Sequence, residues 1–479
     1  MSAGRSGGLA AAALRPLSRA DIASLRLDHA RRAWIERVRI VAVAGVASST
    51  FCLSVAHAQM VDSTAAREVG FSPERLERLH AMLEAEVTAG HLGSGVGLVA
   101  RDGLIVYLGA VGEAAPGVPM FTDAIVRLAS VGKGFTAVAA LILYERGELD
   151  LDDRIADYIP TFSKARVAVT DADGATKFIA PERPLTIRHL LTHTGGLDLS
   201  SEAFERAWMA TEAKTTTRDL AERIARLPMP AHPGTAFEYG SYGSSYEVLA
   251  AVIEQVSGRT LEEFFDENLF RPLGMTDSHF WVPESKLERL ATIYRTRNGQ
   301  LTVERPRGEE TPRTTFMSGG GGVRSTVRDM YRFGQMLLNG GELDGVRILS
   351  PKTVSLMTTD HVAELQPWGQ TEYGWGFGAA VRNRVRDDGI GSAGTFGWNG
   401  GSGAIYWVDP LEGIVAVLVT PVGPPPRWDI FDKFERLMYA AIVESRAFEM
   451  RAPPPMVSIA GRDTIKPRRQ TGTSRVPGT

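Results

Sequence analysis

Ser130 and Lys133 are the two residues whose types and spacing could do chemistry together. They stand three positions apart in Ser130-Val131-Gly132-Lys133, at the start of a predicted helix. An i, i+3 spacing places both side chains on one helix face, one turn apart. A lysine amine in that position can take the proton from a serine hydroxyl that attacks a carbonyl carbon.

A lysine acts as a base only where its surroundings lower its pKa. Desolvation or a neighbouring cation does this, and the positive end of a helix also favours a nearby oxyanion. The spacing alone is weak evidence, because the chain has eight lysines and about 0.6 such pairs arise by chance at average serine usage. An exposed helix start, with Ser130 near the cap, is the structural alternative.

Other motifs in the chain fit competing chemistries poorly. A G-x-S-x-G sequence occurs only at Gly4 to Gly8, with no strand before it, which disfavours an ordinary α/β-hydrolase. His189 and His193 have the spacing of a zinc helix but lack the glutamate of H-E-x-x-H. The glycines at 319–322 are followed by no Lys-Ser/Thr pair and indicate a tight loop beside the site. We therefore expect no metal and no cofactor.

The elements that must position Ser130 and Lys133 show clear local signals. Residues 135–145 form an apolar helical stretch with Gly147 near its end. Ser72 as N-cap and Pro73 at the first helical position predict a helix over 72–89. Residues 97–111 read as a hairpin with its turn at Asp102-Gly103.

The strand pattern returns near the C-terminus. Residues 405–408 and 414–420 flank a turn, and a helix is predicted over 428–444. Hairpins near both ends, with mainly helical sequence between them, predict an α/β (α+β) fold. Its antiparallel sheet is built from both chain ends and flanked by helices, with a helical insertion at about 121–315. The aromatic residues Trp368, Tyr373, Trp375 and Phe377 are expected mainly in the core.

The N-terminal region has the pattern of an export signal. Arginines at 31, 32, 37 and 39 precede the short apolar run 40–55, and Ala56-His57-Ala58 offers small residues at a cleavage site before Gln59. The apolar run is short for a membrane span. We expect residues 1–58 to be removed, leaving a linker at 59–71, a hydrolase domain at 72–445 and a disordered tail at 446–479.

Composition excludes several other classes of protein. The 479 residues are 23% charged and 44% hydrophobic, which is ordinary globular composition. Removing a segment of net charge +5 from a chain of net charge −3 leaves −8, so no basic surface points to nucleic acid. The single cysteine, Cys52, lies in the expected signal, which excludes disulfides and thiolate sites in the mature chain.

Several longer segments around Ser130 carry a family resemblance. They begin with VRLASVGKGFTAVAALILYERGELDLDDRIADYIP and continue with TIRHLLTHTGGLD, HPGTAFEYG, VIEQVSGRTLEEFF, RPLGMTDSHF and GGGVRSTVRDMYRFGQMLLNGG. In this order, from about residue 70 to 445, the chain resembles the serine β-lactamase / penicillin-binding-protein-like superfamily. The similarity is greatest to class C β-lactamases and family VIII carboxylesterases. The resemblance implies that Ser130 is the nucleophile and Lys133 its base.

The resemblance also implies a catalytic tyrosine, for which the sequence offers two candidates. The spacing after Pro233-Gly234 selects Tyr239, with Ser241 in the place of the family's usual asparagine in the substrate site. Counting back from Val252-Ile253-Glu254 selects Tyr242 instead. The chosen tyrosine would share a proton with Lys133 and Ser130 and later protonate the leaving group.

The family's third element, Lys-Thr-Gly in β-lactamases, resembles Trp398-Asn399-Gly400 here. By this resemblance the backbone N–H groups of Ser130 and Gly401 form the oxyanion hole, and Trp398 and Gly400 contact substrate. A cation at the first position usually holds a substrate carboxylate, whereas Trp398 offers an apolar face that suits a neutral ester. An arginine elsewhere in the chain could supply the positive charge that the missing lysine would provide.

These features together predict an exported serine hydrolase, foremost a carboxylesterase acting on a small-molecule ester. A β-lactamase or D-amino-acid-specific peptidase with the same machinery is the first alternative, with a lactam as the possible substrate. The second alternative is a non-catalytic binding or sensor domain on the same scaffold. The sequence predicts no nucleic-acid partner and no stable membrane span after signal cleavage, and it gives no oligomeric state.

Overall fold

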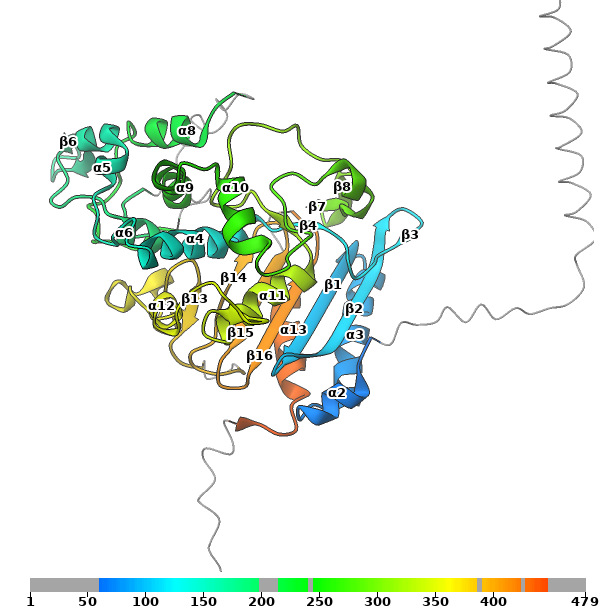
Figure 1. Cartoon of the computed structure of the whole chain (residues 1–479). Coiled ribbons are helices and arrows are strands. Elements are labelled where there is room, and N and C mark those ends of the chain that lie inside the picture. The colour runs from blue at the N-terminus through cyan, green and yellow to red at the C-terminus, as the bar shows by residue number, and fades with distance from the viewer. Residues whose placement is uncertain (1–59, 198–213, 240–243, 386–389, 424–426, 447–479) are drawn as a thin grey trace, which may run out of the picture. The chain divides into compact units, whose positions relative to one another are not determined.

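A long antiparallel sheet joins the two ends of the described chain (Figure 1). The computed structural model describes residues 60–197, 214–239, 244–385, 390–423 and 427–446. The predicted signal, Ser241, Tyr242 and the predicted tail after residue 446 lie outside these residues. The sheet order is β12-β13-β14-β15-β16-β1-β2-β3, so N-terminal strands pair with C-terminal ones as the sequence predicted.

Each strand of the sheet pairs with the strands next to it in sequence, except where β1 meets β16 and Val96 lies opposite Val419. Their bounds are β1 Ser94–Arg101, β2 Leu104–Ala115, β3 Val118–Pro119, β12 Tyr373–Trp375, β13 Ala380–Arg382, β14 Phe396–Gly400, β15 Ala404–Asp409 and β16 Ile414–Val419. The β1–β2 turn has positive φ at Asp102 and Gly103, in agreement with the predicted hairpin.

Helices cover both faces of this sheet. On one face α3 (Pro73–Thr88) and α13 (Trp428–Ala440) pack on alternate side chains such as Val99 and Ala416. On the other face α4 (Lys133–Glu145) and α11 (Val327–Leu338) pack on the intervening ones, such as Leu98 and Val417. Ser72 caps α3 as predicted, whereas α13 ends at Ala440, four residues before the predicted end.

The remaining helices are α2 Ser63–Glu68, α5 Ile155–Tyr158, α6 Ile187–Leu191, α8 Thr217–Ile224, α9 Ser244–Ser257, α10 Leu261–Phe265 and α12 Pro351–Met357. Helix α2 lies in the stretch predicted as a linker, and its Ala66 is fully buried. Short 3-10 or π turns are η1 Ala129–Gly132, η2 Pro160–Lys164, η3 Asp266–Phe270, η4 Glu284–Arg289, η5 Ala363–Leu365 and η6 Pro367–Gly369. No helix in the described ranges has the length and apolarity needed to cross a membrane.

The inserted region also contains strands that the sequence analysis did not identify. Two hairpins, β5 Val167–Thr170 with β6 Thr176–Ile179 and β7 Ile293–Arg297 with β8 Gln300–Arg305, interrupt its helices. Two further pairs extend beyond that region: β4 Val126–Arg127 pairs with β9 Arg324–Ser325, and β10 Glu342–Leu343 pairs with β11 Val346–Arg347. Strand β4 leads directly into the turn that carries Ser130.

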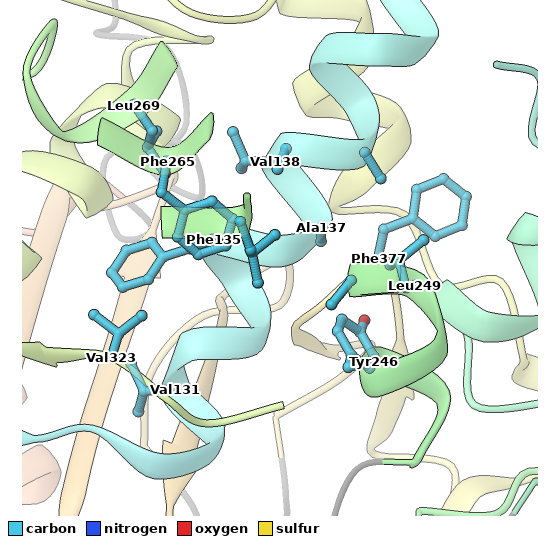
Figure 2. Close-up of a cluster of buried hydrophobic side chains, with 14 of the residues drawn as sticks. Val131, Phe135, Ala137, Val138, Tyr246, Leu249, Phe265, Leu269, Val323 and Phe377 are labelled. Carbon is cyan, nitrogen blue, oxygen red and sulfur yellow. The ribbon is translucent and has the colours of Figure 1, made fainter. Parts of the chain in front are cut away.

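Helix α4 lies at the centre of the larger core (Figure 2). Every residue from Lys133 to Leu143 is buried, as expected for a helix with apolar residues all round. Phe135 meets Phe333 edge-to-face at a ring-centroid distance of 4.7 Å and also packs against Phe265. This packing fixes the helix that begins at Lys133, so the amine of Lys133 is held by a rigid element.

Candidate active site

Ser130 lies in the 3-10 turn η1, immediately before α4. Ala129 ahead of it has φ 47°, in the left-handed region that a residue with a Cβ occupies at a cost of about 1–2 kcal/mol. The backbone of Gly321 packs closely on this turn, because a Cβ at Gly321 would lie 3.0 Å from the Ala129 carbonyl carbon. The strained turn is thus held in place by its neighbours, a pattern found at functional sites.

Lys133 and Ser130 are in direct contact. Lys133 Nζ lies 2.7 Å from Ser130 Oγ and donates to the Gly320 carbonyl at 3.0 Å. The lysine is 1% exposed. Its amine thus has one hydroxyl and one carbonyl oxygen as hydrogen-bond partners inside the core.

Two tyrosine rings flank the amine of Lys133. Its Nζ lies 5.2 Å from the ring centroid of Tyr239 and 5.9 Å from that of Tyr246. The Tyr239 hydroxyl accepts a hydrogen bond from Trp398 Nε1 at 2.8 Å. Within the described part of the chain, that hydroxyl makes no hydrogen bond to Ser130 or Lys133. The structure therefore brings Tyr239 beside the pair through its ring, and its role in proton transfer stays a prediction.

His193 packs under Tyr239, with ring centroids 4.6 Å apart. Burial, with the charge of Lys133, holds the pKa of His193 well below its usual value, so the ring is neutral. The His193 carbonyl accepts from the Glu238 amide at 2.8 Å, which sets the position of the neighbouring Tyr239. His189 is used differently, since its Nδ1 completes the capping box with Thr186 at the start of α6. In the described ranges no cluster of three or more potential metal ligands occurs.

Glycines at the end of β14 allow the strand to approach Ser130 closely. A Cβ at Gly400 would lie 2.0 Å from the Leu128 carbonyl oxygen and 3.3 Å from the Ser130 amide nitrogen. At Gly401 a Cβ would meet nothing within 4 Å, so space for a substrate opens there. Ser402 Oγ donates to the Arg127 carbonyl at 2.5 Å and ties this turn to β4. The amides of Ser130 and Gly401 thus come from adjacent segments at the same edge.

Aromatic side chains form a wall beside Tyr239. Trp398 stacks on Trp368 at 5.8 Å and meets Trp375 edge-on at 4.5 Å. Trp375 and Phe377 are fully buried, as expected for core residues. Trp368 is 47% exposed, and together with Tyr373 it lines a cavity of about 310 Å³ whose lining does not include Ser130.

A second cavity, of about 370 Å³, opens directly beside Ser130. Ala129, Gly321, Gly401 and Ser402 line the side next to Ser130. Its remaining lining is rich in arginine and comprises Arg127, Arg295, Arg305 and Arg324 with Ile293, Glu304, Thr311 and Gly423. Arg127 and Arg324 both contact Glu310, at 3.5 and 2.7 Å. Burial and the neighbouring Arg324 lower the pKa of Arg127 to about 10.

Glu247 in α9 is a site residue that the sequence analysis missed. It is fully buried and accepts from Ser318 Oγ at 2.6 Å and from the amides of Gly319 and Gly320 at 3.0 and 3.1 Å. Burial raises its pKa to about 7, although these donors and Lys133 oppose the rise. The available signal was a single acidic residue at the start of the apolar run 248–253.

Comparisons with known proteins identify a family model, relatives and solved structures that are similar to most of this chain. Residues 79–436 match the family model described as Beta-lactamase. Esterase EstB of Burkholderia gladioli is 31% identical over 379 residues, covering 72% of this chain and 89% of EstB. Penicillin-binding protein 4 of Amycolatopsis lactamdurans is 30% identical over 340 residues, covering 71% of this chain and 82% of that protein. The solved structure of EstCE1, a hydrolase with promiscuous acyltransferase activity, superposes with TM-score 0.64 and 27% identity over 76% of this chain and 98% of its own.

Proposed function

This chain belongs to the beta-lactamase family, and on that premise we propose that it is an exported esterase that forms an acyl-enzyme on Ser130. The observation that carries the proposal is the 2.7 Å contact between Ser130 Oγ and the buried Lys133 Nζ. A hydroxyl and an amine held in this way are a nucleophile and its base.

The acylation step uses groups already aligned at the site. Lys133, in its amine form, takes the proton from Ser130 Oγ as that oxygen bonds to the ester carbonyl carbon. The carbonyl electrons move to oxygen, and the oxyanion is stabilised by the Ser130 and Gly401 amides. The C–O bond to the alcohol then breaks, and the alcohol leaves with the proton that Lys133 accepted. Water repeats these steps on the acyl-enzyme, which releases the acid and restores Ser130.

The second proton carrier in this proposal is Tyr239. Its ring lies against Lys133, and its hydroxyl accepts from Trp398 Nε1. That bond leaves the phenolic proton free to pass to the leaving alcohol, and Tyr239 then regains a proton from Lys133, so one proton in all moves from Ser130 to the alcohol. Tyr242 is the alternative for this role and lies outside the described residues, as does the proposed substrate-binding residue Ser241.

The preference for an ester rests on the side chain at position 398. Trp398 presents an indole, packed in the aromatic wall, where a lysine would hold a substrate carboxylate. An indole face binds apolar groups and offers no full charge to an anion. The similarity to EstB and EstCE1 supports the same preference.

A β-lactamase or peptidase activity is the second candidate, and the arginine-lined cavity beside Gly401 favours it. Arg305 and Arg295 there are only partly buried and could bind the carboxylate of a lactam or peptide. The similarity to penicillin-binding protein 4 is consistent with this reading.

Steady-state rates distinguish the two candidates. The proposal predicts a kcat/KM for a neutral short-chain aryl ester at least about 100-fold above that for a cephalosporin, a difference of roughly 3 kcal/mol in transition-state binding. The reverse order would assign the site to lactams or peptides. The Ser130→Ala variant serves as the blank for both substrates, because it removes only the attacking hydroxyl.

Export is part of the proposal and has its own test. The arginines at 31–39, the apolar run and the Ala-His-Ala sequence predict cleavage before Gln59. When the full chain is expressed in a Gram-negative host, the periplasmic protein should have a mass that begins at Gln59. Retention of the full-length mass in the cytoplasm would contradict export and leave the hydrolase proposal intact.

A further inference from the structure

Glu247 lies directly beneath the loop that touches the catalytic lysine. Its Oε1 accepts from Ser318 Oγ and the Gly320 amide, and its Oε2 accepts from the Gly319 amide. Glycine is required for this approach, because a Cβ at Gly319 would lie 2.5 Å from the Tyr246 carbonyl oxygen. One carboxylate therefore gathers three donors from three consecutive residues.

The same loop carries the acceptor for Lys133. The Gly320 carbonyl accepts from Lys133 Nζ at 3.0 Å, and the Gly319 carbonyl accepts from Thr136 Oγ1 in the next turn of α4 at 2.7 Å. Glu247 thus binds the N–H groups of Gly319 and Gly320, while the carbonyl oxygens of the same two residues bind side chains of α4. A shift of the loop would move the oxygen that orients the Lys133 amine toward Ser130.

Only the ionised carboxylate satisfies this arrangement in full. All three partners of Glu247 donate, and an ionised carboxylate only accepts. A protonated carboxyl can keep its contact with Ser318 by donating to the hydroxyl oxygen, but the carboxyl oxygen that carries the proton is then a weak acceptor for the Gly320 amide. Protonation therefore loosens the loop on the side away from Lys133.

We propose that Glu247 is a positioning residue: its carboxylate holds the Gly319-Gly320 loop so that the Gly320 carbonyl directs Lys133 Nζ onto Ser130. Acylation of Ser130 then weakens in acid as the carboxylate takes up a proton. The inference rests on the proposed function, because it requires Ser130 and Lys133 to be the working pair.

Glu247 titrates near neutral pH, whereas its neighbours Tyr246 and His193 do not. A protonated Lys133 lowers the pKa of Glu247, and the loop partners are uncharged. Tyr246, next to it in α9, has its pKa raised well above 10 by burial, and His193 of the neighbouring segment is held neutral. Burial raises the pKa of Glu247 itself to about 7. Because the ionised form is the competent one, the rate should fall as pH decreases through about 7.

The test measures the rate at which a fluorophosphonate labels Ser130 between pH 5.5 and 8.5. Glu247→Gln should label about 10- to 100-fold more slowly at pH 8, the cost of a misplaced catalytic group, and its rate should not fall between pH 8 and 6. Glu254→Gln is the matched control, since Glu254 lies two turns along α9 and bonds to Thr217 and the Leu261 amide, away from Ser130. It should keep the wild-type rate and profile.

A second variant keeps the carboxylate and removes one donor. Ser318→Ala should raise the pKa of Glu247 further and move the acid limb to higher pH. The inference is overturned if Glu247→Gln keeps the wild-type rate, or if the acid limb is unmoved in Ser318→Ala. Failure of the wild-type protein to label at any pH would instead overturn the proposed function and the inference that rests on it.

Discussion

At the residue scale, the site depends on which side chains are absent as well as on those present. Gly400 and Gly321 bring two backbone segments onto the turn that holds Ser130. The consecutive glycines at 400–401 and 319–322 were visible in the sequence, but the atoms that Gly400 and Gly321 approach belong to segments far away in the chain. A single sequence could therefore mark position 400 as close to substrate without identifying its contact with Leu128.

Gly400→Ala tests this close approach. The added methyl would lie 2.0 Å from the Leu128 carbonyl oxygen, so β14 must move away from the Ser130 amide. We expect fluorophosphonate labelling to slow by at least about tenfold, a loss of roughly 1.4 kcal/mol in transition-state stabilisation, with a lower urea midpoint.

Gly401→Ala is the control for stability, because its Cβ meets nothing within 4 Å. Its urea midpoint should match that of the wild-type protein. A Gly400→Ala variant with wild-type stability and labelling would show that β14 does not pack closely on the turn that holds Ser130.

The site residues differ in how far the sequence alone could predict them. The spacing of Ser130 and Lys133 allowed their contact, because a helix start fixes i, i+3 geometry locally, and the family resemblance was needed to single out this pair. Tyr239 required the family resemblance, and its hydroxyl bonds to Trp398, a partner 159 positions away. Glu247 escaped notice because its role depends on a loop more than seventy residues further along the chain.

At the element scale, sequence patterns predicted the regular pieces well. Ser72 and Pro73 marked the start of α3, and Asp102-Gly103 marked the first hairpin turn. Short exposed strands were harder to predict. Residues 176–179 are all exposed in β6, so no alternation of buried and exposed side chains distinguishes that strand from a loop.

Phe434 in α13 offers a prediction for an element away from the site. Its ring is fully buried against Trp407 and Tyr107, with centroids 5.9 and 6.4 Å away. Phe434→Leu should lower the free energy of unfolding by about 1–2 kcal/mol, because it leaves part of the aromatic volume empty. Urea unfolding measures this loss.

The folded Phe434→Leu protein should label Ser130 at the wild-type rate, because α13 packs on the opposite face of the sheet from α4. Slower labelling by a fully folded Phe434→Leu protein would mean that packing on the α13 face of the sheet affects the α4 face, contrary to this prediction.

At the scale of the whole molecule, the two chain ends meet in one sheet and the inserted region completes the site. The sequence predicted this arrangement from strand signals at both ends, and the family match and the structure confirm it. Substrate choice could not be predicted in the same way. The aromatic wall at Trp398 is apolar, whereas the cavity beside Gly401 is lined by arginines. Each arises only when distant segments fold together.

The most direct test of the central claim is the intact mass of the protein after brief mixing with an activated ester and acid quenching. The account predicts one added acyl group, located on Ser130 by peptide mapping and absent from Ser130→Ala. An unmodified mass that persists across esters and lactams would contradict it and would leave the chain as a binding domain on a hydrolase scaffold.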